Sequence, residues 1–397
     1  MSCSQFGGFF SFKEKHMWNW MTGRKTVARP QMTMQSQLKA QWTSRQYTPL
    51  VKEGYEKNVI VYRCVTMIAR GIATVPWLLY EGDTELFTHP LLQLLQHPSP
   101  GESGASFLES LATSFLLSGN AFVHLDRDSQ GIPQRLKTLR PDRVRVITEN
   151  GQVAAYDYTV EGATCRLPTE CVFQLKSVHP LNDWYGLSPI EVAAMAIDQH
   201  NAVSTHNLAL LQNGGRPSGV FIWKGTEDGW GLTDEQKQSI RDSITQVYSG
   251  QGNAGRIMVL EGDVEWKELG LSPKDLDFSE GKHIAAREVS QAFGVPPMLV
   301  GVPGDATYTN YKEARFHLWE DTILLLLERF QHAFTQFVAK QYDENLRFSY
   351  DVDAIAALAP RREATWRKLS DASFLSENEK RQALGYSPSN ATLHPID

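Results

Sequence analysis

The segment at residues 293–310 reads FGVPPMLVGVPGDATYTN and lies between two stretches with helical patterns. It contains three prolines and three glycines, residue types that shape the backbone and interrupt helices. Residues 279–293 before it have helical spacing, and residues 311–341 after it carry a broad apolar stripe whose helix would extend about 45 Å. Such a loop could hold a phosphate, close over a substrate, or line a path along which another molecule slides.

The composition is that of a globular protein, with 42% apolar and 21% charged residues in a chain of 397. Four scattered cysteines without a Cys-x-x-Cys pair favour a reducing compartment and predict no zinc site. Of these, Cys165 and Cys171 are expected to pack rather than to bind a metal. No apolar run approaches the roughly eighteen residues of a membrane span, and the apolar residues near the start precede the basic ones, the reverse of a secretory signal. We therefore expect a soluble, intracellular protein without a membrane partner.

Residues 1–48 are expected to form a basic, flexible arm. Residues 1–47 hold seven Lys or Arg and one Glu, a net charge of +6, so the rest of a chain whose total is −6 carries −12. The arm could be a solvated tail, or it could dock on a partner or touch nucleic acid. Its aromatic residues could dock on another chain or pack on the body of the same chain: Phe9, Phe10, Phe12, Trp18 and Trp20.

The periodicity changes along the chain in a way that predicts an α+β fold. Residues 59–75 and 105–120 have helical spacing, the second closed by Gly119 and Asn120 as a C-cap. From residue 121 the spacing becomes two, and Asn150-Gly151 predicts a hairpin within a mixed, mainly antiparallel sheet. A helix then begins at Ser188, and a β-α-β-β block at 216–271 follows as an inserted unit.

Motifs for catalysis are weak or absent in this sequence. GQGNAG at residues 250–255 matches G-x-G-x-x-G, but a predicted helix precedes it and a strand follows, the reverse of a dinucleotide site. There is no phosphate-binding loop with Lys, no H-E-x-x-H and no G-x-S-x-G. His200 and His206 are placed on nearly opposite helix faces, and no base accompanies the carboxylates near residue 277. The sequence therefore predicts no enzyme activity, no cofactor and no metal.

Several stretches together resemble the portal proteins of tailed phages, in the branch common among long-tailed phages. The resemblance runs from about residue 58 to 388, and the chain also resembles portals of phage-derived gene transfer agents. The matching stretches are SGNAFVHL, LRPDRVRV, YGLSPIEVA, NGGRPSGVF, YSGQGNAGRIMVLEGDVEWKEL, VSQAFGVPPMLVG and SENEKRQALGYSP.

This resemblance implies a structural protein of the virion rather than an enzyme. A ring of about twelve subunits, a dodecamer, would sit at one capsid vertex after assembly in the host cytoplasm. Double-stranded DNA would pass through it during packaging and ejection, without sequence-specific contacts. The implied partners are the terminase large subunit, head–tail connector or adaptor proteins and the major capsid protein. An adaptor that binds a portal, or a nucleotide-using transferase built on GQGNAG, are the alternatives.

The resemblance also assigns regions to the predicted elements. A wing with a mixed sheet and helices covers 49–187, stem helices cover 188–214 and 273–293, and a β-α-β-β clip covers 215–272. A tunnel loop at 294–310, a long wing helix at 311–341 and a small helical crown at 342–397 complete the chain. The clip would face terminase and connectors through Trp223, Lys224, Lys237, Arg241, Gln251 and Asn253. The tunnel loop would line the DNA channel through Val302, Gly304, Asp305, Ala306, Thr307, Tyr308, Thr309 and Asn310.

The charges of the chain favour a channel through which DNA passes over a surface that binds DNA tightly. An acidic body would attract DNA little, and the opening segment contains a single charged residue, Asp305. Small and polar groups can touch a sugar–phosphate backbone without reading bases. Tyr308 and Asn310 are the side chains expected nearest DNA, although Tyr308 could instead cap the long helix.

Overall fold

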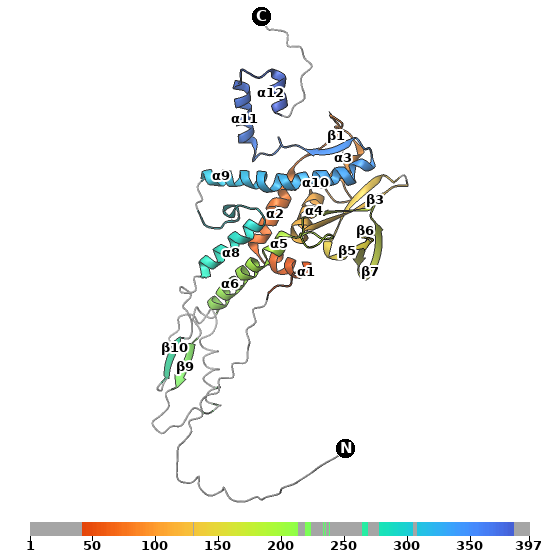
Figure 1. Ribbon diagram of the computed structural model, residues 1–397. Helices are drawn as coiled ribbons and strands as arrows, with labels where there is room; N and C mark the ends of the chain where they lie inside the picture. The colour runs from red at the N-terminus through yellow and green to blue at the C-terminus, as the bar shows by residue number, and fades with distance from the viewer. Residues whose placement is uncertain are drawn as a thin grey trace, which may run out of the picture. The chain divides into compact units, whose positions relative to one another are not determined.

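The computed structural model describes residues 42–129, 131–212, 219–223, 233, 235, 238, 264–268, 278–304 and 308–384 (Figure 1). The basic arm up to residue 41 and the GQGNAG motif lie outside these residues. No helix among them is long and apolar enough to cross a membrane.

Two helices pack together in the hydrophobic core: α2 (Val59–Thr74) and α4 (Gly104–Ser118). Asn58 caps α2, because its side-chain oxygen accepts hydrogen bonds from the N–H groups of Ile60 and Val61. Gly119 ends α4 with φ = 70°, which confirms the predicted C-cap. A Cβ atom at Gly119 would lie 2.5 Å from the carbonyl oxygen of Gly186, so only glycine fits this close approach.

The strands of the described chain pair antiparallel in small sheets, and with the helices they confirm the α+β class. The turn between β5 (Val144–Glu149) and β6 (Gln152–Val160) is the predicted hairpin, with φ = 51° at Asn150 and 74° at Gly151. The first sheet orders β11 (Leu346–Tyr350), β1 (Trp77–Glu81) and β2 (Thr84–Glu85). Two others order β4 (Pro133–Leu139), β3 (Asn120–Arg127) and β8 (Val172–Lys176), and β5 (Val144–Glu149), β6 (Gln152–Val160) and β7 (Ala163–Pro168).

Strand β11 departs from the helical region expected at 342–397. It pairs with β1, so that Trp77 lies opposite Tyr350. Phe348 is fully buried and contacts Trp77 and Phe334 edge to face. The region therefore begins with a strand of the core, and the helical part comprises α11 (Ala359–Asp371) and α12 (Glu377–Ala383).

The long helix expected at 311–341 is present but changes its winding. A π-helical turn, η5 (Leu318–Ile323), separates α9 (Tyr308–His317) from α10 (Leu324–Phe337), and the 3₁₀ turn η6 (Ala339–Gln341) follows. The π-turn lies where α2 approaches closely, since a Cβ at Gly71 would be 2.7 Å from the Cδ1 of Ile323. Beyond it, Phe330 and Phe334 of α10 are fully buried in the core.

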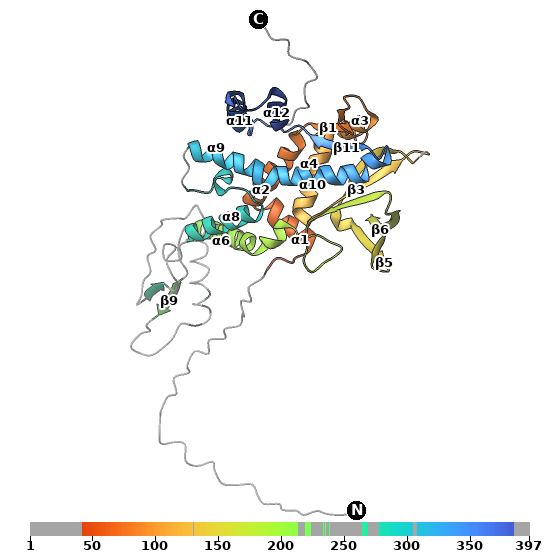
Figure 2. The ribbon, with the colours of Figure 1, turned by 45° about the horizontal axis from the view of Figure 1, so that its top comes forward.

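The two predicted stem helices lie side by side in both ribbon views (Figures 1 and 2). The first is divided at Ala193 into α5 (Pro189–Val192) and α6 (Ala194–Gln212), and the second is α8 (Phe278–Ala292). Ser188 caps α5 through a hydrogen bond from the N–H of Glu191, as its position before Pro189 predicts. Between α6 and α8 in the chain, β9 (Gly219–Trp223) pairs antiparallel with β10 (Val264–Glu268).

Candidate functional site

The connection from α8 to α9 begins with a Schellman motif centred on Gly294. Gly294 has φ = 68°, its N–H donates to the carbonyl of Gln291, and the N–H of Val295 donates to the carbonyl of Ser290 at 2.9 Å. Phe293 and Val295 on either side are buried in the core. The chain therefore leaves α8 in a defined direction rather than as a loose end.

The same glycine is fixed to the long helix. The Oγ1 of Thr322, in the π-turn η5, donates a hydrogen bond to the carbonyl of Gly294 at 2.7 Å. A Cβ at Gly294 would lie 2.6 Å from that oxygen. The π-turn thus holds the start of the loop by a contact that a larger residue would disrupt.

The middle of the loop forms the 3₁₀ turn η4 (Pro297–Val300), which ends at Gly301 with φ = 83°. A backbone hydrogen bond closes this turn, in which the N–H of Val302 donates to the carbonyl of Pro297 at 3.2 Å. Pro303, the residue after Val302, is held by α8, because the Nη2 of Arg287 donates to the carbonyl of Pro303 at 2.8 Å. The loop is consequently anchored as far as Pro303.

Of the predicted channel residues, Val302 does not fit its expected position. Its side chain is buried with Leu299 in the main hydrophobic cluster, because an apolar residue directly after the turn packs inward. Gly304 and Asn310 are exposed, and their place in the channel stays a prediction. Tyr308 and Thr309 are the first residues of α9, and their side chains lie outside the described part of the structure. Asp305, Ala306 and Thr307 lie wholly outside it.

The predicted clip residues also fall mostly outside the described chain. Trp223 is the last residue of β9 and lies opposite Val264 of β10. The remaining predicted clip residues are not among the described ones: Lys224, Lys237, Arg241, Gln251 and Asn253. The predicted capping box of Thr233 with Gln236 falls there too, since Gln236 is not described.

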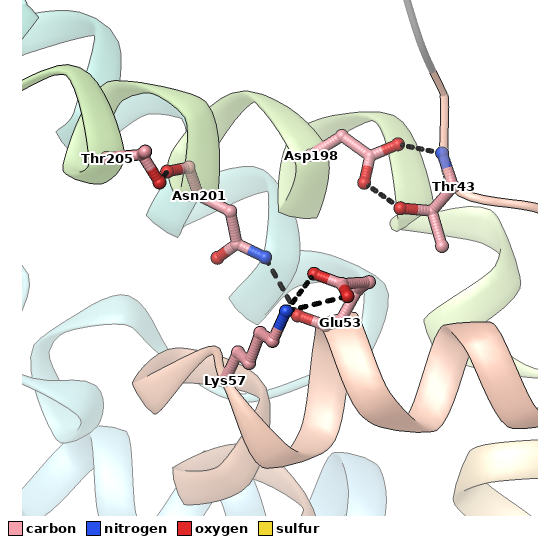
Figure 3. A network of polar contacts seen from close by, with 6 residues as sticks. All are labelled: Thr43, Glu53, Lys57, Asp198, Asn201 and Thr205. Carbon is pink, nitrogen blue, oxygen red and sulfur yellow. Dashed lines mark hydrogen bonds and ion pairs between the residues drawn. The ribbon is translucent and has the colours of Figure 1, made fainter.

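A polar network that no sequence motif predicted holds the N-terminal half of α6. Asn58 is buried, and its Nδ2 donates to the Oδ1 of Asn201 at 3.0 Å, while the Nδ2 of Asn201 donates to the carbonyl of Glu53 at 2.8 Å. Figure 3 shows Asn201 of α6 beside Glu53 of the π-helical turn η1 (Val51–Glu56) and Lys57, which follows that turn. It also shows Asp198 of α6 facing Thr43. An Asn directly before a helical pattern is the one sequence signal for this network, as an N-cap.

His200 lies in the same part of α6 as Asn201, and its side chain is buried. Its Nδ1 lies 3.2 Å from the Nδ2 of Asn58, which can donate to it. Burial lowers the pKa of His200, with a smaller contribution from the nearby charge of Lys282. The residue therefore acts as a neutral hydrogen-bond partner in the core.

The cysteines and acidic residues form no metal site in the described ranges, where no group of three His, Cys, Asp or Glu gathers. Cys64 is fully buried, and burial raises the pKa of its thiol to about 12. Cys165 was expected to pack, but it is exposed because it lies on β7, a strand with little buried surface. Cys171 is half-buried.

The sequence of this chain is similar to those of known proteins. The model of the family described as phage portal protein matches residues 59–385. An uncharacterized protein of Rickettsia bellii (strain RML369-C) is 37% identical over 341 residues, 84% of this chain and 88% of that protein. The portal protein of Enterobacteria phage HK97 is 25% identical over 248 residues, 61% of this chain and 57% of that protein.

Solved structures extend this similarity. A chain in the neck of an empty gene transfer agent (GTA) particle, computed with C6 symmetry, is 39% identical with a TM-score of 0.70, over 88% of this chain and 96% of that chain. A chain in the neck of the native particle, computed with C12 symmetry, is also 39% identical with a TM-score of 0.68, over 88% of this chain and 95% of that chain. An HK97-family portal protein from Corynebacterium diphtheriae has a TM-score of 0.58 at 16% identity, over 80% of this chain and 99% of that chain, and shares the fold.

Proposed function

Because the chain belongs to the phage portal protein family, we propose that about twelve copies form a ring at one vertex of a gene-transfer-agent or phage particle. The observation that carries this proposal is the 39% identity, over nearly the whole of both chains, to a chain from the neck of a gene transfer agent particle. The ring would be the channel through which double-stranded DNA enters and leaves. It would work without catalysis of its own.

The paired helices α6 and α8 support an assignment of these helices to the stem of the ring. They pack along each other, and the polar network of Asn58 and Asn201 fixes α6 to the start of α2. Such a fixed pair can hold the wall of a channel while DNA moves past it. The strands β9 and β10, which lie between the two helices in the chain, would belong to the clip that meets the terminase large subunit and the connector proteins.

The anchoring and the charge of the connection between α8 and α9 support its assignment to the channel lining. Its base is held by Thr322 at Gly294 and by Arg287 at Pro303, and residues 294–304 carry no charged side chain. Each Lys or Arg that held a phosphate would add salt-dependent affinity and slow the passage of DNA. The segment would touch the duplex without adding a charge of its own, while the guanidinium of Arg287 donates to the carbonyl of Pro303.

Electron microscopy of the purified protein tests the ring directly. We expect annular particles with about twelvefold symmetry. A protein that stays monomeric or dimeric at all concentrations and salt conditions would refute the proposal. The channel is tested separately with particles assembled without this protein, which should contain no DNA. DNA-filled particles would exclude the channel role.

A further inference from the structure

One exposed surface of the described chain combines aromatic and basic side chains. It lies on α2 and on the π-helical turn η1 (Val51–Glu56) before it, and we call it the α2 face: Tyr55, Val59, Tyr62, Arg63 and Arg70. Val59 is 67% and Tyr62 48% exposed, and the rings of Tyr55 and Tyr62 are 5.3 Å apart. Arg70 pairs with Glu109 at 3.1 Å, whereas Arg63 has no ion-pair partner in the described part of the chain. Exposed apolar area beside arginine is typical of a surface that another protein covers.

A second exposed surface combines an apolar side chain with acidic ones. It follows the outer side of η5 and α10, and we call it the α10 face: Asp321, Leu325 and Glu328. These residues follow each other at spacings of four and three, so they form one stripe. Leu325 is 56% exposed, and the side chains of Asp321 and Glu328 are 65% and 58% exposed. Each carboxylate has a histidine four residues away, His317 at 3.1 Å from Asp321 and His332 at 3.9 Å from Glu328, and both keep exposed area towards solvent.

The two faces point away from the contact between their helices. Gly71 of α2 meets Ile323 of the π-turn, where a Cβ would lie 2.7 Å from the Cδ1 atom. Tyr62 precedes Gly71 by nine residues, or about two and a half turns, so it is on the other side of α2. Leu325 follows Ile323 by two residues, a rotation of about 200°, so it is on the other side of α10. The faces are therefore available to two different neighbours.

We propose that the α2 face of one copy docks on the α10 face of the next copy around the ring. The inference rests on the proposed ring, in which every subunit must present two different, complementary surfaces to its neighbours. Arg63 would face the carboxylates of Asp321 and Glu328, and Tyr62 would cover Leu325. The opposite charges of the two faces identify a second copy of this chain as the occupant of each.

Charge reversal tests this interface in the full-length protein. Arg63→Glu, or Asp321→Lys together with Glu328→Lys, places like charges across every interface of the ring. Each should raise the concentration for half-maximal ring formation at least about tenfold, measured by sedimentation velocity and electron microscopy. All three changes in one chain should restore assembly, because every interface then carries the swapped pair. Glu149→Lys, at the end of β5 and exposed, is the matched control and should assemble like the wild type.

A mixing experiment tests the head-to-tail geometry. Arg63→Glu subunits mixed with equal amounts of Asp321→Lys/Glu328→Lys subunits should form alternating rings, although neither assembles well alone. Circular dichroism of each variant checks that it is folded. We expect all of them to fold, because the three substituted residues are exposed. Rings of both single-face variants at the wild-type concentration, or no rescue in the triple variant, would overturn this interface and leave the proposed function standing. A wild type that never forms rings would instead refute the proposed function.

Discussion

The contact between Gly294 and Thr322 offers a sharp test of how the loop after α8 is held. Gly294→Ala would place a Cβ 2.6 Å from the Oγ1 and 3.5 Å from the Cγ2 of Thr322 while φ stays near 68°. The left-handed backbone costs a non-glycine residue about 1–2 kcal/mol, and overpacking against the fixed threonine adds about 1–3 kcal/mol. The free energy of unfolding should therefore fall by about 2–5 kcal/mol.

Gly301→Ala is the matched control for the backbone contribution. Gly301 also has a positive φ, 83°, but no heavy atom lies within 4 Å of the added Cβ. Its unfolding free energy should fall by the backbone contribution alone, about 1–2 kcal/mol. The two glycines differ in the steric contact with Thr322, so the difference between their effects measures that contact.

Urea unfolding of dissociated subunits, followed by circular dichroism, provides the measurement. A double-mutant cycle completes it, because Thr322→Ala removes both the Oγ1 and the Cγ2 atoms. In that background Gly294→Ala should cost only about 1–2 kcal/mol. If Gly294→Ala is no more destabilising than Gly301→Ala, or if its cost is unchanged without the Thr322 side chain, the loop is not held by this contact.

Gly304→Pro restricts the backbone at the exposed end of the loop, just after the hydrogen bond from Arg287 to Pro303. Rings should still form, but particles should package or retain little DNA, measured as nuclease-protected DNA per particle. Normal DNA filling would contradict a channel role for this residue. The pKa of buried His200 is lowered from 6.5, so the unfolded chain binds this proton more tightly, and the stability from the neutral ring is present above pH 6.5 and lost as the pH falls below it. The urea midpoint should therefore fall between pH 7.5 and 5.5 by more in the wild type than in His200→Gln, and equal falls would exclude His200 as the cause. Iodoacetamide at pH 8 should modify exposed Cys165 well before Cys64, whose thiol has a pKa of about 12, and mass spectrometry that finds Cys64 modified first would show that the core opens readily.

Local signals in the sequence were sufficient for most helices and turns. The helix caps at Gly119 and Ser188 and the hairpin at Asn150-Gly151 depend on neighbouring residues only, and all three are present as predicted. The family was also recognisable from short stretches in a fixed order, and the match over residues 59–385 confirms it.

Features that depend on distant parts of the chain were missed. Strand β11 looked like part of a helical region, because five residues have no clear preference until β1, some 270 positions earlier, offers its edge. Val302 was expected to line the channel, yet the turn at Gly301 directs its side chain into the core. The role of Asn201 could not be read from its neighbours, since its partners Asn58 and Glu53 are about 145 residues away.

The sequence by itself determined the α+β class, the caps and turns, and membership of the portal family. Each of these depends on backbone preferences and residue order that act over a few positions. Only the tertiary structure decided that the loop at residues 293–304 is anchored, by Thr322 from the π-turn and by Arg287 from α8. These contacts arise because close packing at Gly71 and Gly294 brings separate helices together, and that packing depends on side chains far apart in the chain.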